Sequence, residues 1–169
     1  MTPKRSTKDE YYLNIAREVS LHSTCFRRAI GAIIIRDDQI ISTGYAGAPR
    51  KTKDSLEHGY CLRDKLNIPH GHRYELCRSV HAEQNTIINA ARAGVSLLGG
   101  DMYLYASKLG ENKPLNAFPC FICKKMIINA GLNRVICSAE EGKIKIFLVR
   151  DWIKDWQKND IVDDKHQYG

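Results

Sequence analysis

The sequence lacks the long apolar run that marks a membrane-embedded protein. No stretch in its 169 residues approaches the roughly 18 apolar residues that a spanning helix needs, so we expect no membrane segment. The N-terminal segment MTPKRSTKDEYY is polar and has no apolar core, so we do not expect a secretory signal. Both absences favour a soluble protein of the cytoplasm.

Long runs of one charge are also missing, although the chain is basic. Lys and Arg outnumber Asp and Glu by 26 to 19, which gives a formal net charge of +7. This balance favours anionic partners, whether nucleic acid or small phosphates. No block of five like charges forms a basic tail, so we do not expect nucleic acid to be the partner.

Repeats, low-complexity segments and internal linkers are absent as well. Apolar residues make up 43% of the chain and charged residues 27%, which is typical of globular proteins. A chain of this length can bury a sizeable core. We therefore expect residues 1–169 to form a single domain.

Hydrophobic patterns predict an α/β fold. Helical spacing of apolar residues predicts helices over 8–22, 80–94, 120–131 and 151–158. Short apolar runs predict strands at 29–36, 39–45, 102–107, 134–138 and 145–149. The first two strands should form a hairpin, and alternation of strands and helices in the second half favours parallel crossovers. We expect a three-layer α/β/α domain with a mixed sheet of about five strands.

Three local signals place the helix ends. Ser79 can cap the helix over 80–94, Pro119 suits the first position of the helix over 120–131, and Gly131 can close that helix. Between the hairpin and the second helix, residues 46–78 are long, irregular and rich in Gly and Pro. A loop of this length is usually functional, or is held by something other than an apolar core.

Six cysteines without a secretory signal indicate a reducing compartment, where we do not expect disulfides. His81, Cys120 and Cys123 stand out as zinc ligands. A Cys-x-x-Cys at a helix start lets both thiolates bind one ion, and a third ligand leaves a fourth position open for water, as in catalytic zinc sites. Glu83 is spaced to reach past the ion to that water and to carry its proton.

His81-Ala82-Glu83 followed by Pro119-Cys120-Phe121-Ile122-Cys123 matches the H-x-E … P-C-x-x-C signature of zinc nucleobase deaminases. Other segments narrow the match: STCFRRAIGAIII (23–35), IISTGYAGAP (40–49), LCRSVHAEQN (76–85) and PCFICKKMIINAGLNRV (119–135). Over roughly residues 10–137 the chain resembles the deoxycytidylate (dCMP) deaminases of the cytidine-deaminase-like superfamily.

The resemblance implies hydrolytic deamination of dCMP to dUMP and ammonia, which feeds thymidylate synthesis. It implies a mixed five-stranded sheet, a catalytic zinc ion and Glu83 as the proton carrier. The Ala82 backbone amide would hold the base carbonyl, and Asn85 would lie in the substrate pocket. Such enzymes are commonly hexameric, activated by dCTP and inhibited by dTTP, so the resemblance also implies a homo-oligomer with nucleotide effectors.

A second, structural zinc ion is a further implication, because some dCMP deaminases carry one. Cys25 falls on the first ligand of that site, whereas Ser55 stands at the familiar second position. Cys61 would then substitute for it, with Cys77 as another ligand. The fourth ligand stays open among His58, His70 and His72. The alternative is three free, buried thiols.

The chain departs from the family pattern in two places. Ala46 replaces the asparagine usual in the Gly-Tyr-Asn-Gly segment, which removes a hydrogen-bonding group near the nucleotide or effector. The insert 108–118 is longer than the minimal form and should lie beside the pocket. Five arginines near motif segments are candidates for phosphate contacts: Arg27, Arg28, Arg50, Arg73 and Arg78.

Three other functions are alternatives to dCMP deamination. One is deamination of another base or nucleotide, including adenosine in tRNA, which the positive charge favours. Another is a non-catalytic binding module stabilised by zinc, and the weakest is a structural protein without zinc. Glu83 argues against the module, because a structural zinc site has no use for a carboxylate beside an open position.

Overall fold

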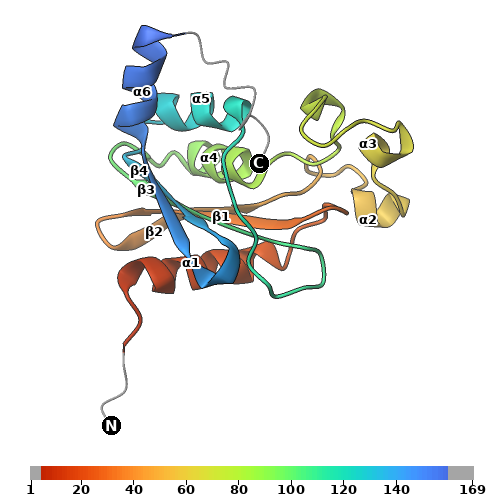
Figure 1. Cartoon of the computed structure of the whole chain (residues 1–169), viewed down its shortest axis with the longest axis horizontal. Coiled ribbons are helices and arrows are strands. Elements are labelled where there is room, and N and C mark those ends of the chain that lie inside the picture. The colour runs from red at the N-terminus through yellow and green to blue at the C-terminus, as the bar shows by residue number, and fades with distance from the viewer. Residues whose placement is uncertain (1–4, 160–169) are drawn as a thin grey trace.

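The computed structural model describes residues 5–159, and these residues form one five-stranded mixed sheet with the order β2-β1-β3-β4-β5 (Figure 1). Only β3 and β4 are parallel; the other neighbours are antiparallel. The strands are β1 (Ala29–Arg36), β2 (Gln39–Tyr45), β3 (Asp101–Ser107), β4 (Arg134–Ser138) and β5 (Ile144–Leu148). The predicted hairpin and mixed sheet are thus confirmed.

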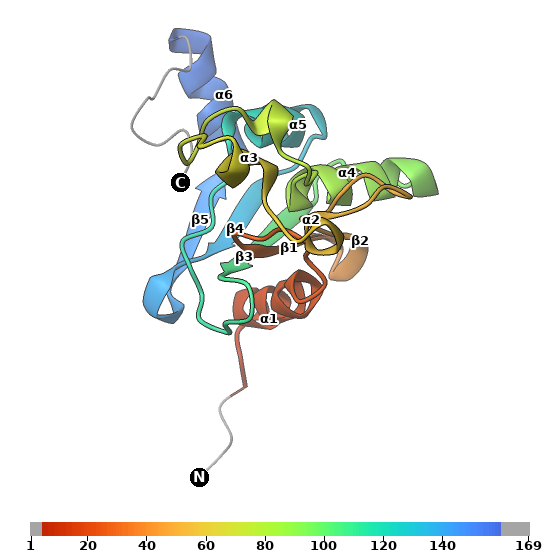
Figure 2. The same cartoon turned by 90° about the vertical axis from the view of Figure 1, so that its right-hand side faces the viewer.

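Helices cover both faces of this sheet (Figures 1 and 2). α1 packs on one face, against β1 and β3, while α4 and α5 lie on the other face. The helices are α1 (Lys8–Ser20), α2 (Ser55–His58), α3 (Leu62–Lys65), α4 (Ala82–Ala93), α5 (Phe121–Asn129) and α6 (Val149–Lys158). The three-layer α/β/α prediction is confirmed. None of the helices between residues 5 and 159 has the length and apolar character needed to traverse a lipid bilayer.

Alternation along β1 divides the core into two layers. Ala32 and Ile34 face α4 and α5, whereas Ile33 and Ile35 face α1. Successive side chains of a strand point to opposite sides, so a strand covered on both faces must be apolar at every position. This explains the continuous apolar run that marks β1 in the sequence.

The parallel crossover predicted from alternating strands and helices is confirmed, because β3 and β4 are parallel and are joined through α5. β5 follows β4 without a long helix between them and is antiparallel to it, because residues 139–143 are too few for a crossover connection. Two predicted helix starts are wrong. α4 is capped by His81 rather than Ser79, with the His81 N–H donating to Gln84 Oε1 at 3.0 Å. α5 is capped by Cys120, so Pro119 precedes the cap instead of occupying the first helical position.

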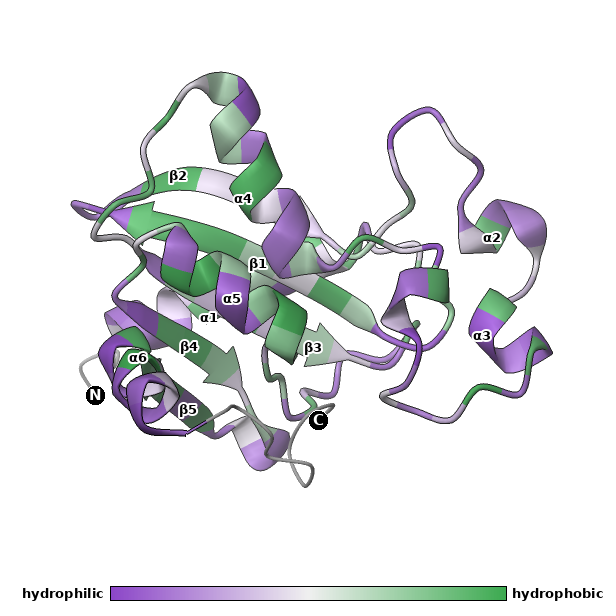
Figure 3. Cartoon of the chain, turned by 90° about the horizontal axis from the view of Figure 1, so that it is seen from above, coloured by the Kyte–Doolittle hydropathy of each residue, from purple (hydrophilic) through white to green (hydrophobic). Residues whose placement is uncertain are grey.

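The segment between β2 and α4 contains the short helices α2 and α3 and projects to one side of the layers (Figure 3). Most of its residues are hydrophilic. Between Gly47 and Ser79, Cys61 is the one apolar side chain that is buried in the described structure. This agrees with the expectation that an apolar core does not hold the segment.

Candidate active site

The starts of α4 and α5 bring His81, Cys120 and Cys123 together. His81 Nδ1 lies 3.5 Å from Cys120 Sγ and 3.4 Å from Cys123 Sγ. Both cysteines are buried and His81 is half-buried. Within residues 5–159 this is the one group of three such side chains whose ligand atoms all lie within 4.8 Å of one another.

The donor set fits zinc. Zn–S bonds of about 2.3 Å and Zn–N bonds of about 2.0–2.1 Å, at tetrahedral angles, place a sulfur and a nitrogen about 3.6 Å apart. The two sulfur–nitrogen distances here are 3.5 and 3.4 Å, and the thiol and imidazole donors are those that zinc prefers. Three protein ligands leave one tetrahedral position for water.

Close packing of α4 on β2 positions His81. At Gly44 a Cβ atom would lie 2.4 Å from the Thr86 backbone nitrogen and 2.9 Å from the Ala82 carbonyl oxygen, so only glycine admits the helix this near. The Thr86 hydroxyl donates to Ala82 O at 2.7 Å, and Ser42 Oγ donates to Thr86 O at 2.8 Å. Glycine on the strand and these hydrogen bonds hold the first turns of α4 on the sheet.

Glu83 lies on the first turn of α4, and its side chain reaches the pocket wall beside the Cys123 sulfur. It is 4% exposed, and this burial raises the pKa of its carboxyl group. Hydrogen bonds from Cys123 and His81 lower the pKa of Cys120 to about 4, against the effect of burial. The group therefore combines a stabilised thiolate with a buried carboxyl.

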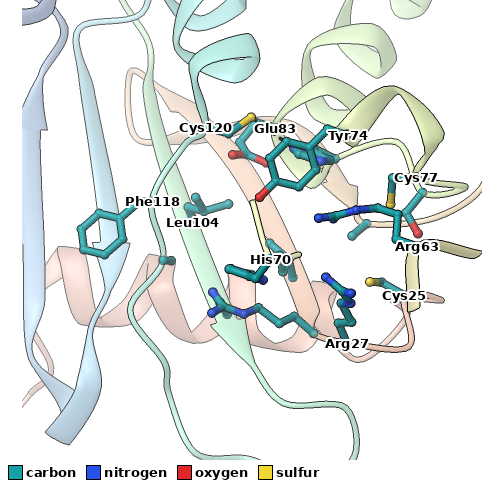
Figure 4. A pocket seen from close by; sticks show the side chains of 17 residues that line it. Cys25, Arg27, Arg63, His70, Tyr74, Cys77, Glu83, Leu104, Phe118 and Cys120 are labelled. Carbon is teal, nitrogen blue, oxygen red and sulfur yellow. Dashed lines mark hydrogen bonds between the residues drawn. The ribbon is translucent and has the colours of Figure 1, made fainter. Parts of the chain in front are cut away.

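His81, Cys120 and Cys123 are the candidate metal-binding group, and two of them, His81 and Cys120, line a cavity of about 100 Å³ (Figure 4). Seventeen residues line it, among them His81, Glu83 and Cys120. The rest of the lining is cationic, with Arg27, Arg28 and Arg63 in it, and Glu83 is the one carboxylate among the described lining residues. A small cavity with a metal group at one end and positive charge elsewhere suits an anionic small molecule.

The two features in which the chain departs from the family pattern, Ala46 and the insert 108–118, both lie at this cavity. Ala46 is 4% exposed and is part of the lining. Ala117 and Phe118, at the end of the insert 108–118, line it as well, so the insert lies beside the pocket as expected. The insert is fixed to the sheet by hydrogen bonds from Leu115 N to Ala106 O and from Ala117 N to Ser138 O, at 2.8 and 2.9 Å.

Ala82 and Asn85 are placed differently from the other predicted site residues. Neither is among the residues that line the cavity. Ala82 is fully buried in the first turn of α4, where its N–H has no acceptor within the helix. Asn85 Nδ2 donates to Tyr45 O at 2.8 Å and ties α4 to the end of β2. Their roles toward the substrate stay predictions.

Cys25, Cys61 and Cys77 are neighbours, but they do not form a ready ligand group. Burial raises the pKa of Cys77, and the nearby Cys25 and Cys61 raise it further. The three sulfurs are outside the set of ligand atoms that converge within 4.8 Å in the described chain. His70, one of the three histidine candidates, lines the cavity together with Cys25 and Cys77. A second zinc ion stays a prediction.

The arginines near the motifs divide into two groups. Arg27 and Arg28 line the cavity, and Arg27 forms an ion pair with Asp64. The other candidates lie outside the lining: Arg50 donates to Asn89, Arg73 pairs with Glu75, and Arg78 is partly buried. The sequence interpretation missed Arg63, which follows Cys61 by two residues and had no motif to mark it.

Comparisons with known proteins agree with this geometry. The family model for the cytidine and deoxycytidylate deaminase zinc-binding region matches residues 6–139. A deoxycytidylate deaminase of Schizosaccharomyces pombe is 29% identical over 132 residues, which are 78% of this chain and 37% of that protein. The matched region is thus less than two fifths of the yeast protein's length. The deoxycytidylate deaminase of Enterobacteria phage T4 is 30% identical over 153 residues, covering 73% of this chain and 74% of the phage protein.

A solved structure shows the same fold. The dCMP deaminase of cyanophage S-TIM5, crystallised in complex with dCMP and dUMP, is 25% identical and superposes with a TM-score of 0.59. The superposition covers 82% of this chain and 85% of the phage chain. The family match spans most of the chain and includes the His81, Cys120 and Cys123 group. The chain therefore belongs to the cytidine and deoxycytidylate deaminase family.

Proposed function

We propose that the chain is a zinc-dependent hydrolase that deaminates dCMP to dUMP and ammonia. The observation that carries this proposal is the buried Glu83 carboxyl beside the His81, Cys120 and Cys123 group in the wall of a cationic cavity. A site that only stabilised the fold would need no buried carboxyl at an open coordination position. Relatives from yeast and phage T4 that bear the name deoxycytidylate deaminase support the choice of substrate.

The reaction forms a C–O bond at C4 of cytosine and breaks the bond from C4 to the exocyclic nitrogen. A zinc ion held by His81, Cys120 and Cys123 would supply Lewis acidity that lowers the pKa of water toward about 7. Glu83 accepts a proton from the attacking water and delivers it to N3 of the ring. It then transfers the second proton to the departing amine. One water proton ends at N3 of uracil and the other in ammonia, so the reaction balances.

Other parts of the chain orient the reactants. Burial of Glu83 keeps bulk water from competing for its proton. The Ala82 amide, which has no acceptor within α4, is proposed to hold the base carbonyl. The arginines of the cavity lining are proposed to hold the phosphate. Asn85 is proposed to act near the substrate, and its hydrogen bond to Tyr45 anchors the start of α4 there.

A substrate panel tests the proposal. Zinc-loaded protein is incubated with dCMP, deoxycytidine, CMP, cytidine, dCTP and a tRNA anticodon stem-loop, and ultraviolet absorbance and ammonia release are followed. We expect the highest kcat/KM for dCMP, because a site built for a phosphate leaves buried donors unpaired when the phosphate is missing. A strong preference for adenosine in the stem-loop would contradict the proposal, and no turnover of any substrate would favour a binding module.

We also propose that the enzyme works in the cytoplasm as a homo-oligomer, with residues 1–169 as one deaminase domain. A hexamer, with dCTP as activator and dTTP as inhibitor, is what the family resemblance supports. Light scattering measures the assembly, and kinetics at fixed dCMP with each triphosphate measures the regulation. A monomer whose rate responds to neither triphosphate would contradict this part of the proposal and leave the chemistry intact.

A further inference from the structure

A buried arginine lines the cavity without an ionic partner. Arg63 lies on α3 and is 3% exposed. None of the ion pairs in the described part of the chain includes it. Arg27, in the same lining, contrasts with it, because its charge is matched by Asp64. Arg63 therefore brings an unmatched positive charge to the pocket.

Two contacts hold the Arg63 guanidinium in place. One Nη donates to Pro69 O at 3.1 Å, and the guanidinium carbon lies 4.6 Å from the centre of the Tyr74 ring. Tyr74 in turn meets His81 edge to face, with ring centres 4.9 Å apart. One aromatic ring thus separates the cation from the metal-binding group, and Figure 4 shows Arg63 and Tyr74 on the same side of the pocket.

The contacts leave part of the guanidinium unsatisfied. Arg63 Nε is buried and has no hydrogen-bond partner among the described residues. Buried donors nearly always have an acceptor, and a buried charge without a counter-charge is strongly unfavourable. Stacking on Tyr74 offsets only part of this cost. An anionic ligand in the cavity would supply both the acceptor and the counter-charge.

We propose that Arg63 binds the phosphate of a nucleoside 5′-monophosphate and sets the preference for nucleotide over nucleoside. This inference rests on the proposed deamination and assigns its specificity to one residue. A guanidinium presents several N–H donors in a fork that matches phosphate oxygens. With the phosphate at Arg63, the base is directed past Tyr74 towards Glu83 and the metal group.

The test separates recognition of phosphate from support of the loop. Arg63→Gln removes the charge, Arg63→Lys keeps it without the fork, and Arg92→Gln is a control with the same charge change at an exposed position of α4. Steady-state kinetics with dCMP and with deoxycytidine are measured for each. We expect Arg63→Gln to lower kcat/KM for dCMP by about 10- to 100-fold, mainly through KM. The kcat/KM for deoxycytidine should change by less than about three-fold, since this substrate has no phosphate for Arg63 to bind.

Equal losses for dCMP and deoxycytidine would overturn the inference, because Arg63 would then only support the pocket wall. Should Arg63→Gln fail to fold, Arg63→Lys must show a smaller loss that is still confined to dCMP. Binding is measured separately by thermal unfolding with dUMP and with deoxyuridine. Wild type should be stabilised more by dUMP, and this difference should shrink in the Arg63 variants.

The outcomes distinguish this inference from the proposed function. A wild type that binds dUMP better than deoxyuridine through Arg63, but deaminates no cytosine compound, would refute the deaminase proposal alone. A wild type that deaminates both substrates equally well, or gains no extra stability from dUMP, would refute the role of Arg63 and leave cytosine deamination standing.

Discussion

Replacing Gly44 by alanine should destabilise the fold and impair the site together, because Gly44 is where α4 lies directly on β2. The new Cβ would lie 2.4 Å from Thr86 N, 2.5 Å from Thr86 Oγ1 and 2.9 Å from Ala82 O. Ordinary van der Waals contacts begin at 3.4 Å, so α4 must move by about 1 Å to relieve the closest clash. Two of the three atoms belong to the backbone, so no side-chain rotation avoids the shift.

The magnitude follows from that displacement. Forcing an extra methyl group into a packed core costs about 1–3 kcal/mol of unfolding free energy. In a chain of this size that lowers Tm by about 2–12 °C. Glu83 lies between Ala82 and Thr86 on the same helix, so it moves with them relative to Cys120. A misplacement of about 1 Å at a reacting centre costs about 100-fold in rate.

Thermal unfolding, zinc content and kcat/KM for dCMP are measured for Gly44→Ala and for Gly142→Ala. The control glycine has a φ of +71° and open space around its Cβ position, so its substitution strains the backbone without touching α4. We expect the control to keep wild-type activity and zinc. A Gly44→Ala variant that unfolds within about 1 °C of wild type and turns over within about two-fold of it would show that α4 tolerates a side chain at position 44.

The remaining predictions concern the proton carrier, the second ion and the core. Glu83→Gln should keep the fold and zinc but lose about 10²–10⁴-fold in kcat, and turnover within about three-fold of wild type would exclude Glu83 as the proton carrier. Plasma emission should find two zinc ions per chain, falling to one when Cys61 and Cys77 are replaced by serine; one ion in fully loaded wild type would contradict the second site. Tyr103 donates to Asp9 at 2.7 Å, so Tyr103→Phe should cost about 1 kcal/mol in denaturant unfolding. Burial and this bond raise the pKa of Tyr103, so folding favours the neutral phenol. The difference in unfolding free energy between wild type and Tyr103→Phe should therefore be constant below pH about 10 and disappear above the raised pKa. A difference that does not change with pH would refute the coupling between this hydrogen bond and the phenol's protonation.

The elements and the metal group could be predicted because their signals are local. The strand at Arg134–Ser138 agrees with its predicted range residue for residue, since a short β-branched run after Gly131 has few alternatives. His81 lies at the start of α4, and Cys120 and Cys123 lie at the start of α5. The direction of a side chain follows from its position in a helix, so the sequence could predict that these three converge.

Features that depend on packing between distant segments could not be predicted. The importance of Arg63 depends on α3 bringing its side chain over Tyr74, eleven residues away in sequence, and no spacing rule marks such a contact. The hydrogen bond from Asn85 to Tyr45 at the end of β2 likewise depends on the register between α4 and the sheet. Whether Cys25 and Cys61 share an ion depends on side-chain convergence that spacing alone does not set.

The unequal construction of the pocket walls has a consequence for hydrogen exchange. The wall with Glu83 stands on the sheet and a three-turn helix, whereas the wall with Arg63 and Tyr74 stands on a segment with a single buried apolar side chain, Cys61. Amides with few apolar contacts open in sub-global steps, at a much smaller free energy than the core. Deuterium should therefore enter residues 55–76 long before it enters α4. Bound nucleotide should slow exchange mainly in that outer segment. Such a result would mark residues 55–76 as the part of the proposed enzyme that opens to substrate, with the proposed reaction taking place against the more rigid wall formed by α4.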